Sequence, residues 1–236
     1  MIGTIIKAEF RNMFRDRMYA FFAVYPAIFG TMGYFLVKWF EDKYPGGVAG
    51  PITAMMLIVV TGYVFGALIA FTLLDDKDDK VLMSLKITPI NVKHYIYVKM
   101  AAGMIFGFVA TLILLLATNF LPNANFFVLI GVALLGAIQV PSVTLIVNSF
   151  SDNKVEGFVV MKLSGMVLMF PVIGFLVAGW AQYLLGVAPG YWAGSLIEVE
   201  LGVDTGSTVL LFFAGIVYNL FATWLLMKFY TKRSNI

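Results

Sequence analysis

Residue types that carry out chemistry are few in this sequence. The 236 residues include one histidine and no cysteine, so disulfides, thiolate catalysis and sulfur-ligated zinc are excluded. We interpret His94 as a surface histidine, because neither partner ligands nor a serine in a G-x-S-x-G context accompanies it. The phosphate-binding pattern G-x-x-x-x-G-K-[ST] does not occur. We therefore expect a chain that is not an enzyme, with no catalytic, cofactor or metal site of its own.

A second group of polar residues lies inside long apolar runs, namely Asn119, Gln139, Asn148, Lys162 and Asn219. Amide side chains in such places usually form hydrogen bonds between helices. Lys162 has two interpretations, a functional intramembrane charge or a lysine whose long side chain reaches back to the lipid headgroups. The apolar runs contain neither carboxylates nor an arginine ladder, which argues against a proton-coupled antiporter and a voltage sensor.

The composition decides which elements must position these groups. The chain is 61% hydrophobic and 12% charged, with a mean hydropathy of +0.92, whereas soluble domains are nearer 45–50% apolar and about 25% charged. Lipid can solvate the excess apolar surface, and in lipid the backbone must form helices or a closed barrel. Long apolar runs without ten-residue alternation favour helices. The sequence thus predicts an all-α polytopic membrane protein.

We expect residues 1–236 to form a single transmembrane domain with six transmembrane helices. A helix needs roughly 20 apolar residues to cross the bilayer. The expected spans are 19–39, 52–74, 98–121, 126–148, 157–180 and 207–230.

The basic residues divide unequally between the two sides that six spans define. The side with both termini carries 14 of the 16 lysines and arginines, and the other side keeps only Lys38 and Lys43. Basic residues are retained in the cytoplasm. Both termini are therefore predicted to be cytoplasmic, in a multi-pass protein of the plasma membrane of a bacterial or archaeal cell.

Residues 1–17 carry apolar side chains at helical spacing, with basic side chains on the other face. They are interpreted as an interfacial amphipathic helix near anionic headgroups, or alternatively as an extension of the first span. The second span closes on four aspartates, whose charge opposes the dipole of a helix C-terminus. This run is either a solvated face or a site. We expect a cytoplasmic charge network formed by Arg11, Arg15, Arg17, Asp75 and Asp76.

A short amphipathic helix is predicted after the acids. An apolar stripe interleaved with Lys80, Ser84 and Lys86 is formed by Val81, Leu82, Leu85 and Ile87. Thr88-Pro89 ends this helix, because a residue before proline avoids the α region, and the same pair can cap the next helix. A short helix across the membrane face would suit binding by a peripheral energy-supplying protein.

This stretch, DDKDDKVLMSLKITPINVKHYIYVK (75–99), resembles the first cytoplasmic loop of the type-two family (type V fold) of ABC export permeases. The resemblance is carried by Asp79, Leu82, Leu85, Thr88, Pro89, Tyr95 and Lys99. Asp replaces the usual Glu, and Lys80 stands where glycine is common. NKVEGFVVMK (153–162), Pro171 and Pro189-Gly190-Tyr191-Trp192 are similar to the later half of bacterial drug-export permeases, among them fluoroquinolone exporters. The order of the motifs carries the resemblance over essentially the whole chain.

The resemblance implies a permease subunit of an ATP-driven ABC exporter. Such a subunit moves a hydrophobic or amphipathic substrate (a drug, a lipid-like molecule or a peptide) out of the cytoplasm by alternating access. Its partners would be two cytoplasmic ABC ATPase subunits, which bind ATP-Mg, and a second permease copy or a paralogue. The predicted short helix would be the coupling helix, with Asp79, Val81, Leu82, Leu85, Thr88 and Pro89 contacting the ATPase.

Two questions stay open from the sequence. Residues 181–206 are long enough to re-enter the membrane as short helices, and their aromatic residues equally suit an ordinary loop anchored at the interface. The alternative function is a membrane channel or scaffold without a motor, which would have no need of a coupling helix. The substrate pathway is not identified.

Overall fold

The computed structural model describes residues 17–87, 91–177 and 179–234, and every regular element in these ranges is a helix. This confirms the all-α class. The helices, with 3-10 helices written η, are α2 (Arg17–Lys43), α3 (Ala49–Asp78), α4 (Val81–Lys86), α5 (Val92–Thr118), α6 (Phe126–Ile138), α7 (Val140–Phe150), α8 (Lys154–Gly165), η1 (Met166–Leu168), α9 (Met169–Leu176), η2 (Trp180–Val187), α10 (Tyr191–Glu200) and α11 (Thr208–Arg233).

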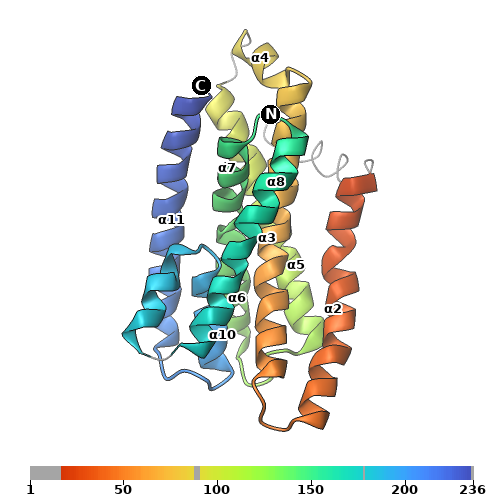
Figure 1. The fold of residues 1–236 in the computed structure, drawn as a ribbon, viewed down its shortest axis with the longest axis vertical. Coiled ribbons are helices and arrows are strands. Elements are labelled where there is room, and N and C mark those ends of the chain that lie inside the picture. The colour runs from red at the N-terminus through yellow and green to blue at the C-terminus, as the bar shows by residue number, and fades with distance from the viewer. Residues whose placement is uncertain (1–16, 88–90, 178, 235–236) are drawn as a thin grey trace.

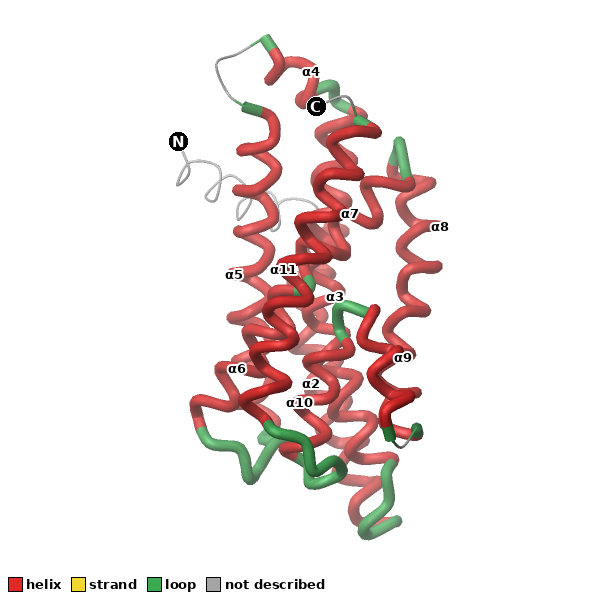
Figure 2. Tube along the Cα trace, turned by 90° about the vertical axis from the view of Figure 1, so that its left-hand side faces the viewer, coloured by secondary structure: helices red, strands yellow, loops and turns green. Residues whose placement is uncertain are grey.

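The long helices run up and down in one bundle (Figure 1). One end holds α4, the α7–α8 connection and the end of α11, and is called the α4 end below. The α2–α3, α5–α6 and α10–α11 connections lie at the opposite end (Figures 1 and 2). The connections therefore alternate between the two ends.

Five helical segments are long and apolar enough to cross a membrane: Ala49–Asp78, Val92–Thr118, Phe126–Phe150, Lys154–Leu176 and Thr208–Arg233. They correspond to the last five expected spans, so the chain is a membrane protein. The first expected span falls in α2, a helix of 27 residues that is about 40 Å long at 1.5 Å per residue. It is not one of the five, and the count of six spans stays a prediction.

Helix α3 is the centre of the bundle, with almost all of its side chains from Ala54 to Leu74 buried. A Cβ on Gly62 would lie 2.0 Å from the carbonyl oxygen of Gly136, and one on Gly66 would lie 2.7 Å from Cβ of Val143. The glycines therefore let α3 approach the α6–α7 span closely, which is the role of small residues in membrane helix pairs.

Polar side chains of the α6–α7 span bind buried backbone carbonyls of α3. Gln139 Nε2 donates to the carbonyl of Val59 (3.1 Å), and Thr144 Oγ1 donates to that of Gly66 (2.9 Å). Further along, Asn148 Nδ2 donates to the carbonyl of Ala70 (3.1 Å). Gln139 and Asn148 thus join helices, as predicted for amides in the apolar runs.

Asparagines start three of the helices. The side chains of Asn91, Asn125 and Asn153 accept hydrogen bonds from backbone N–H groups in the first turns of α5, α6 and α8. The prediction that Thr88-Pro89 caps the third span is therefore wrong. Asn91 is in the extended conformation that a cap requires and its carboxamide accepts from Lys93 N (2.9 Å), so α5 begins at Val92.

The chain between the last two spans folds back into the bundle. From the end opposite α4, η2 climbs and α10 descends beside the lower half of α11 (Figure 1). Their connecting turn reaches the middle of α11, where Tyr218 donates from its hydroxyl to the carbonyl of Val187 and Asn219 donates to that of Pro189 (3.4 Å). This up-and-down pair has the shape of a re-entrant segment.

Candidate functional site

Three consecutive residues at the end of α3 reach in three directions at the α4 end. Asp75 forms an ion pair with Lys154 at the start of α8, at 2.5 Å. Asp76 binds Lys99 of α5, also at 2.5 Å. Lys77 lies 3.9 Å from Asp152 in the α7–α8 connection. The end of α3 is therefore tied to α5, to α8 and to the α7–α8 connection.

The Asp76–Lys99 pair is the most enclosed of these contacts. The Lys99 side chain is 2% exposed, and its ammonium also donates to the carbonyl of Thr72 (3.4 Å). Asp76 Oδ2 accepts a further hydrogen bond from the Tyr95 hydroxyl (3.0 Å). A buried ammonium without a partner would be strongly destabilising, so these contacts fix α5 against α3 directly beneath α4.

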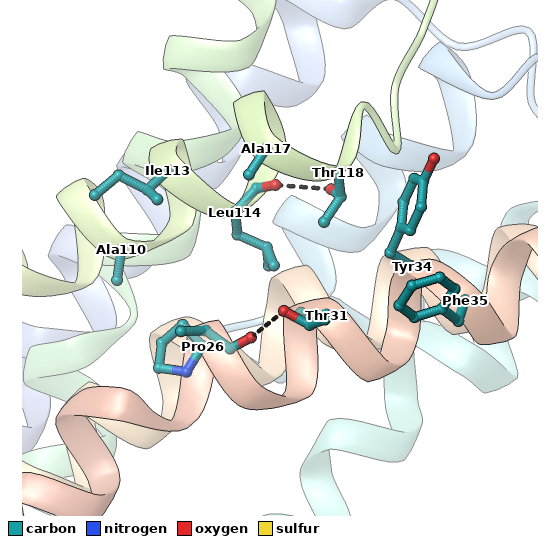
Figure 3. A pocket seen from close by; sticks show the side chains of 11 residues that line it. Pro26, Thr31, Tyr34, Phe35, Ala110, Ile113, Leu114, Ala117 and Thr118 are labelled. Carbon is teal, nitrogen blue, oxygen red and sulfur yellow. Dashed lines mark hydrogen bonds between the residues drawn. The ribbon is translucent and has the colours of Figure 1, made fainter.

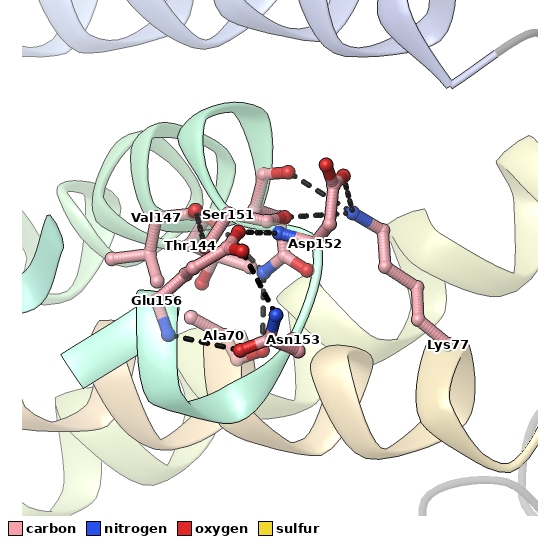
Figure 4. A network of polar contacts seen from close by, with 9 residues as sticks. Ala70, Lys77, Thr144, Val147, Ser151, Asp152, Asn153 and Glu156 are labelled. Atoms are coloured by element: carbon pink, nitrogen blue, oxygen red, sulfur yellow. Dashed lines mark hydrogen bonds and ion pairs between the residues drawn. The ribbon is translucent and has the colours of Figure 1, made fainter. Parts of the chain in front are cut away.

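The α7–α8 connection is ordered by its own hydrogen bonds (Figure 4). Asn153 Oδ1 accepts from Glu156 N (3.0 Å), which caps α8. Glu156 Oε2 accepts in return from the N–H of Asp152, the residue before the cap (2.8 Å). Lys77 Nζ donates to the carbonyl of Ser151 (3.0 Å). The connection is thus a rigid corner that one α3 lysine binds.

Only part of the predicted charge network lies in the described part of the chain. Asp75 and Asp76 are at the expected place and have lysine partners. Arg11 and Arg15 lie outside the described residues, and the side chain of Arg17 is not described. Pairing of the acids with these arginines stays a prediction, as does the interfacial helix at 1–17.

Helix α4 lies across the end of the bundle (Figures 1 and 2), where the short amphipathic helix was predicted. Lys80 precedes it with φ of 59°, a left-handed conformation that glycine adopts more readily than lysine. Asp79 ends α3. This geometry gives a physical reason for glycine at the position of Lys80 in the family that the stretch resembles.

The apolar side chains of α4 point in two directions. Leu82 is 6% exposed and belongs to the apolar cluster around α3 and α5, with Leu85 packed against it. Met83 is 67% exposed and Ile87 is 90% exposed. Val81 is half-buried, while Thr88 and Pro89 lie outside the described residues. The predicted coupling residues are thus largely those that attach α4 to the bundle.

Sequence reasoning missed Met83 and Lys154. Met83 was overlooked because the apolar stripe was assumed to face outward, although an amphipathic helix on a membrane protein can bury that stripe in its own bundle. Lys154 had no signal, because it is 79 positions from Asp75 in the sequence.

A cleft of about 410 Å³ lies beside α4. It is lined by Lys77, Leu82, Met83, Asn148, Asp152, Arg233 and Ser234. Its charged groups are mixed in sign, and Lys77 already donates a hydrogen bond to the α7–α8 connection. The cleft therefore indicates no particular ligand.

A second hollow, of about 470 Å³, lies between α2 and α5 (Figure 3). Its lining is mostly apolar, with hydroxyl groups from Thr31, Tyr34 and Thr118. The hydroxyls of Thr31 and Thr118 both donate to carbonyls of their own helices, at 2.7 Å. The hollow offers apolar contact and no charge. Across the described residues, no group of three or more acidic or histidine side chains could hold a metal ion.

At the opposite end, α10 buries an acid. Glu198 is 3% exposed, and its Oε1 has no hydrogen-bond partner within the described chain. Burial raises the pKa of Glu198 from 4.5 to about 7, and the nearby carboxylate of Asp204 adds to this. The Glu198 side chain is therefore partly protonated near neutral pH.

Comparisons with known proteins show which family the chain resembles. Residues 9–227 match the family model described as "Fluoroquinolones export permease protein Rv2686c-like". Two proteins of Mycobacterium tuberculosis are each 23% identical to the chain over 228 residues, which is 93% of this chain and 90% of the relative. They are the fluoroquinolones export permease proteins MT2760, of strain CDC 1551 / Oshkosh, and Rv2686c, of strain ATCC 25618 / H37Rv. No solved structure matches the chain significantly.

Proposed function

We propose, since the chain belongs to the Rv2686c-like family of fluoroquinolones export permeases, that it is the permease subunit of an ATP-driven ABC exporter of amphipathic drugs. It crosses the cell membrane six times, with α2 as the first span and both termini in the cytoplasm. Two ATPase subunits bind and hydrolyse ATP-Mg on its cytoplasmic side, and a second permease copy or a paralogue completes the transporter. The chain itself is not catalytic and exports its substrate by alternating access.

The distribution of charge supports the orientation. Among the described residues, the basic side chains near the α4 end include Lys77, Lys80, Lys154 and Arg233, whereas the opposite end has Lys38 and Lys43. Because short basic segments are retained in the cytoplasm, the α4 end faces the ATPase. The buried acid of α10 then lies toward the outside.

The exposure pattern of α4 is the observation that carries the coupling proposal. A helix of six residues has little stability of its own, and α4 is anchored by Leu82 in the core cluster. Met83 and Ile87 are exposed, and exposed apolar groups on a rigid support suit a partner surface. In this proposal Met83 and Ile87 enter a hollow of the ATPase, while Leu82 and Leu85 hold α4 in place.

The ion pairs suggest how movement of α4 would reach the spans. A push on α4 acts on the end of α3 and on the start of α5, which Asp76 and Lys99 join. The contact between Asp75 and Lys154 extends the connection to α8. The three spans would therefore shift together, as alternating access requires.

The test is the purified complex of the permease with its ATPase, reconstituted in lipid. Met83→Asp combined with Ile87→Asp should reduce substrate-stimulated ATP turnover by about tenfold or more, the scale of losing an interface hot spot. Co-purification of the ATPase should weaken in parallel. The matched control is Val48→Asp combined with Val203→Asp, which places the same two charges on exposed apolar residues at the opposite end and should leave both readings unchanged.

Normal turnover and association in the double variant would remove α4 as the coupling helix. A chain that passes substrate without any ATPase would instead favour a channel without a motor.

A further inference from the structure

The outer face of the α8–α9 span carries an uninterrupted exposed stripe. Lys162, Met166, Met169, Ile173 and Leu176 follow one another at intervals of three or four residues, and each is exposed. Only 11% of the most apolar part of this span is buried within the molecule. The stripe is therefore available for contact with something other than the rest of the chain.

The opposite face of the same span is firmly attached to α3. Tyr63 donates from its hydroxyl to the carbonyl of Met161 (2.5 Å) and lies 2.9 Å from the Ser164 hydroxyl. A Cβ on Gly157 would lie 2.5 Å from a methyl group of Leu74, so the helices are in close contact there. These contacts fix the rotation of α8, and with it the outward direction of the stripe.

Lys162 is the single charge in this stripe. It lies eight residues, about 12 Å, from the start of α8. Among cations in the described parts of the five spans, it is the furthest from an end of its span, which runs over Lys154–Leu176. Lys99, the next furthest, has a carboxylate partner in Asp76, whereas Lys162 has no ion-pair partner in the described chain.

A charge among apolar side chains at membrane depth is costly and marks a functional position by default. The cost falls when an opposite charge binds it. The next residues along the stripe, Met166 and Met169, have flexible and polarizable side chains that adapt to differently shaped apolar partners. The span also tightens into the 3-10 turn η1 at Met166–Leu168, and such interruptions often mark functional hinges.

We propose that this stripe contacts the exported substrate, and that the Lys162 ammonium binds a carboxylate on an amphipathic aromatic molecule. The aromatic part of the substrate lies against Met166 and Met169, one and two turns further into the membrane. A fluoroquinolone, the class in the relatives' names, carries an aromatic bicycle and a carboxylate. This inference rests on the proposed function and adds the chemical group that the site recognises.

Equilibrium binding by the purified permease in lipid nanodiscs tests the inference without the ATPase. The two probes are a fluoroquinolone and its methyl ester, which keeps the rings and lacks the negative charge. The native chain should bind the acid more tightly than the ester by about tenfold or more, as expected for a charged hydrogen bond. Lys162→Gln should remove this preference and leave the ester's affinity unchanged, and Lys162→Arg should restore much of it.

The control is Lys228→Gln, which removes another exposed lysine of a span, one that lies over the Trp224 ring at 3.7 Å. It should keep the preference for the acid. Equal binding of acid and ester by the native chain, or a preference that survives in Lys162→Gln, would assign Lys162 to the lipid headgroups and overturn the inference. ATP-dependent export is measured separately, so loss of the preference with normal export would leave the proposed function standing.

Discussion

At the scale of single residues, neighbouring carboxylates at the end of α3 have different partners. The sequence predicted that the acids need stabilisation, because they oppose the helix dipole. Lys154 and Lys99 supply it in the described chain. Lys99 is 23 positions from Asp76 and Lys154 is 79 from Asp75, so only the packing of α5 and α8 against α3 brings them together. Sequence spacing could not identify these pairs.

Glu198 allows a prediction at the same scale. Burial raises its folded-state pKa from 4.5 to about 7, so the folded chain favours the protonated form. The contribution to stability is complete below pH 4.5, is lost as the pH rises from 4.5 to about 7, and stays absent above that. Glu198→Gln mimics the neutral acid. We expect it to raise the melting temperature at pH 8, by about 2–4 °C for each kcal/mol of relief.

The gain should shrink as the pH falls to 5, which a thermal unfolding series in detergent would measure. Glu200→Gln is the matched control, because Glu200 is partly exposed and accepts a hydrogen bond from Thr208 (3.0 Å). It should give no such gain. A Glu198→Gln variant that is less stable than the native chain at pH 8 would show that the buried carboxylate is ionised and paired.

At the scale of elements, apolar run length located the spans well, because crossing the hydrocarbon core requires it. Helix ends were less predictable. The third span begins six residues before the expected position 98, since Asn91 provides a cap. The turn into α4 was also not predictable from the residue types alone. Lys80 adopts a left-handed conformation, which the family's glycine would have indicated and a lysine did not.

Gly62 tests the contact between the two central elements. Its Cβ in a Gly62→Ala variant would lie 2.0 Å from the Gly136 carbonyl oxygen and 2.5 Å from Gln139 Nε2. Backbone must therefore shift, and the hydrogen bond from Gln139 to Val59 would be disturbed. Overpacking of this kind costs about 1–3 kcal/mol. We expect a lower melting temperature and a lower yield of folded permease.

Gly131→Ala is the control for this substitution. Gly131 also lies inside a helix, α6, but its added Cβ would be 3.5 Å from the Phe212 ring, an ordinary contact. Because alanine favours helix over glycine by about 1 kcal/mol, this variant should be as stable as the native chain or slightly more so. Equal effects of the two substitutions would contradict the close approach of α3 to the α6–α7 span.

At the scale of the whole molecule, the arrangement follows from one division between apolar helices and charged connections. Composition was sufficient to predict the apolar helices. The side chains that could contact a substrate were not predictable, because apolar residues that face lipid, a partner or a pathway look alike in sequence. The structure separates them by burial: α3 is enclosed, while the α8–α9 span is largely uncovered.

The two-sided arrangement leads to a prediction that single cysteines can test, because the native chain has none. His94 and Lys232 are exposed near the α4 end, and Val48 and Val203 are exposed at the other. A membrane-impermeant maleimide applied to intact cells should label Val48→Cys and Val203→Cys. It should reach His94→Cys and Lys232→Cys only after the cells are permeabilised. The reason is the retention of basic segments in the cytoplasm, and labelling of His94→Cys in intact cells would invert the orientation. The ATPase would then have no access to α4, so the same result would also refute coupling through Met83 and Ile87.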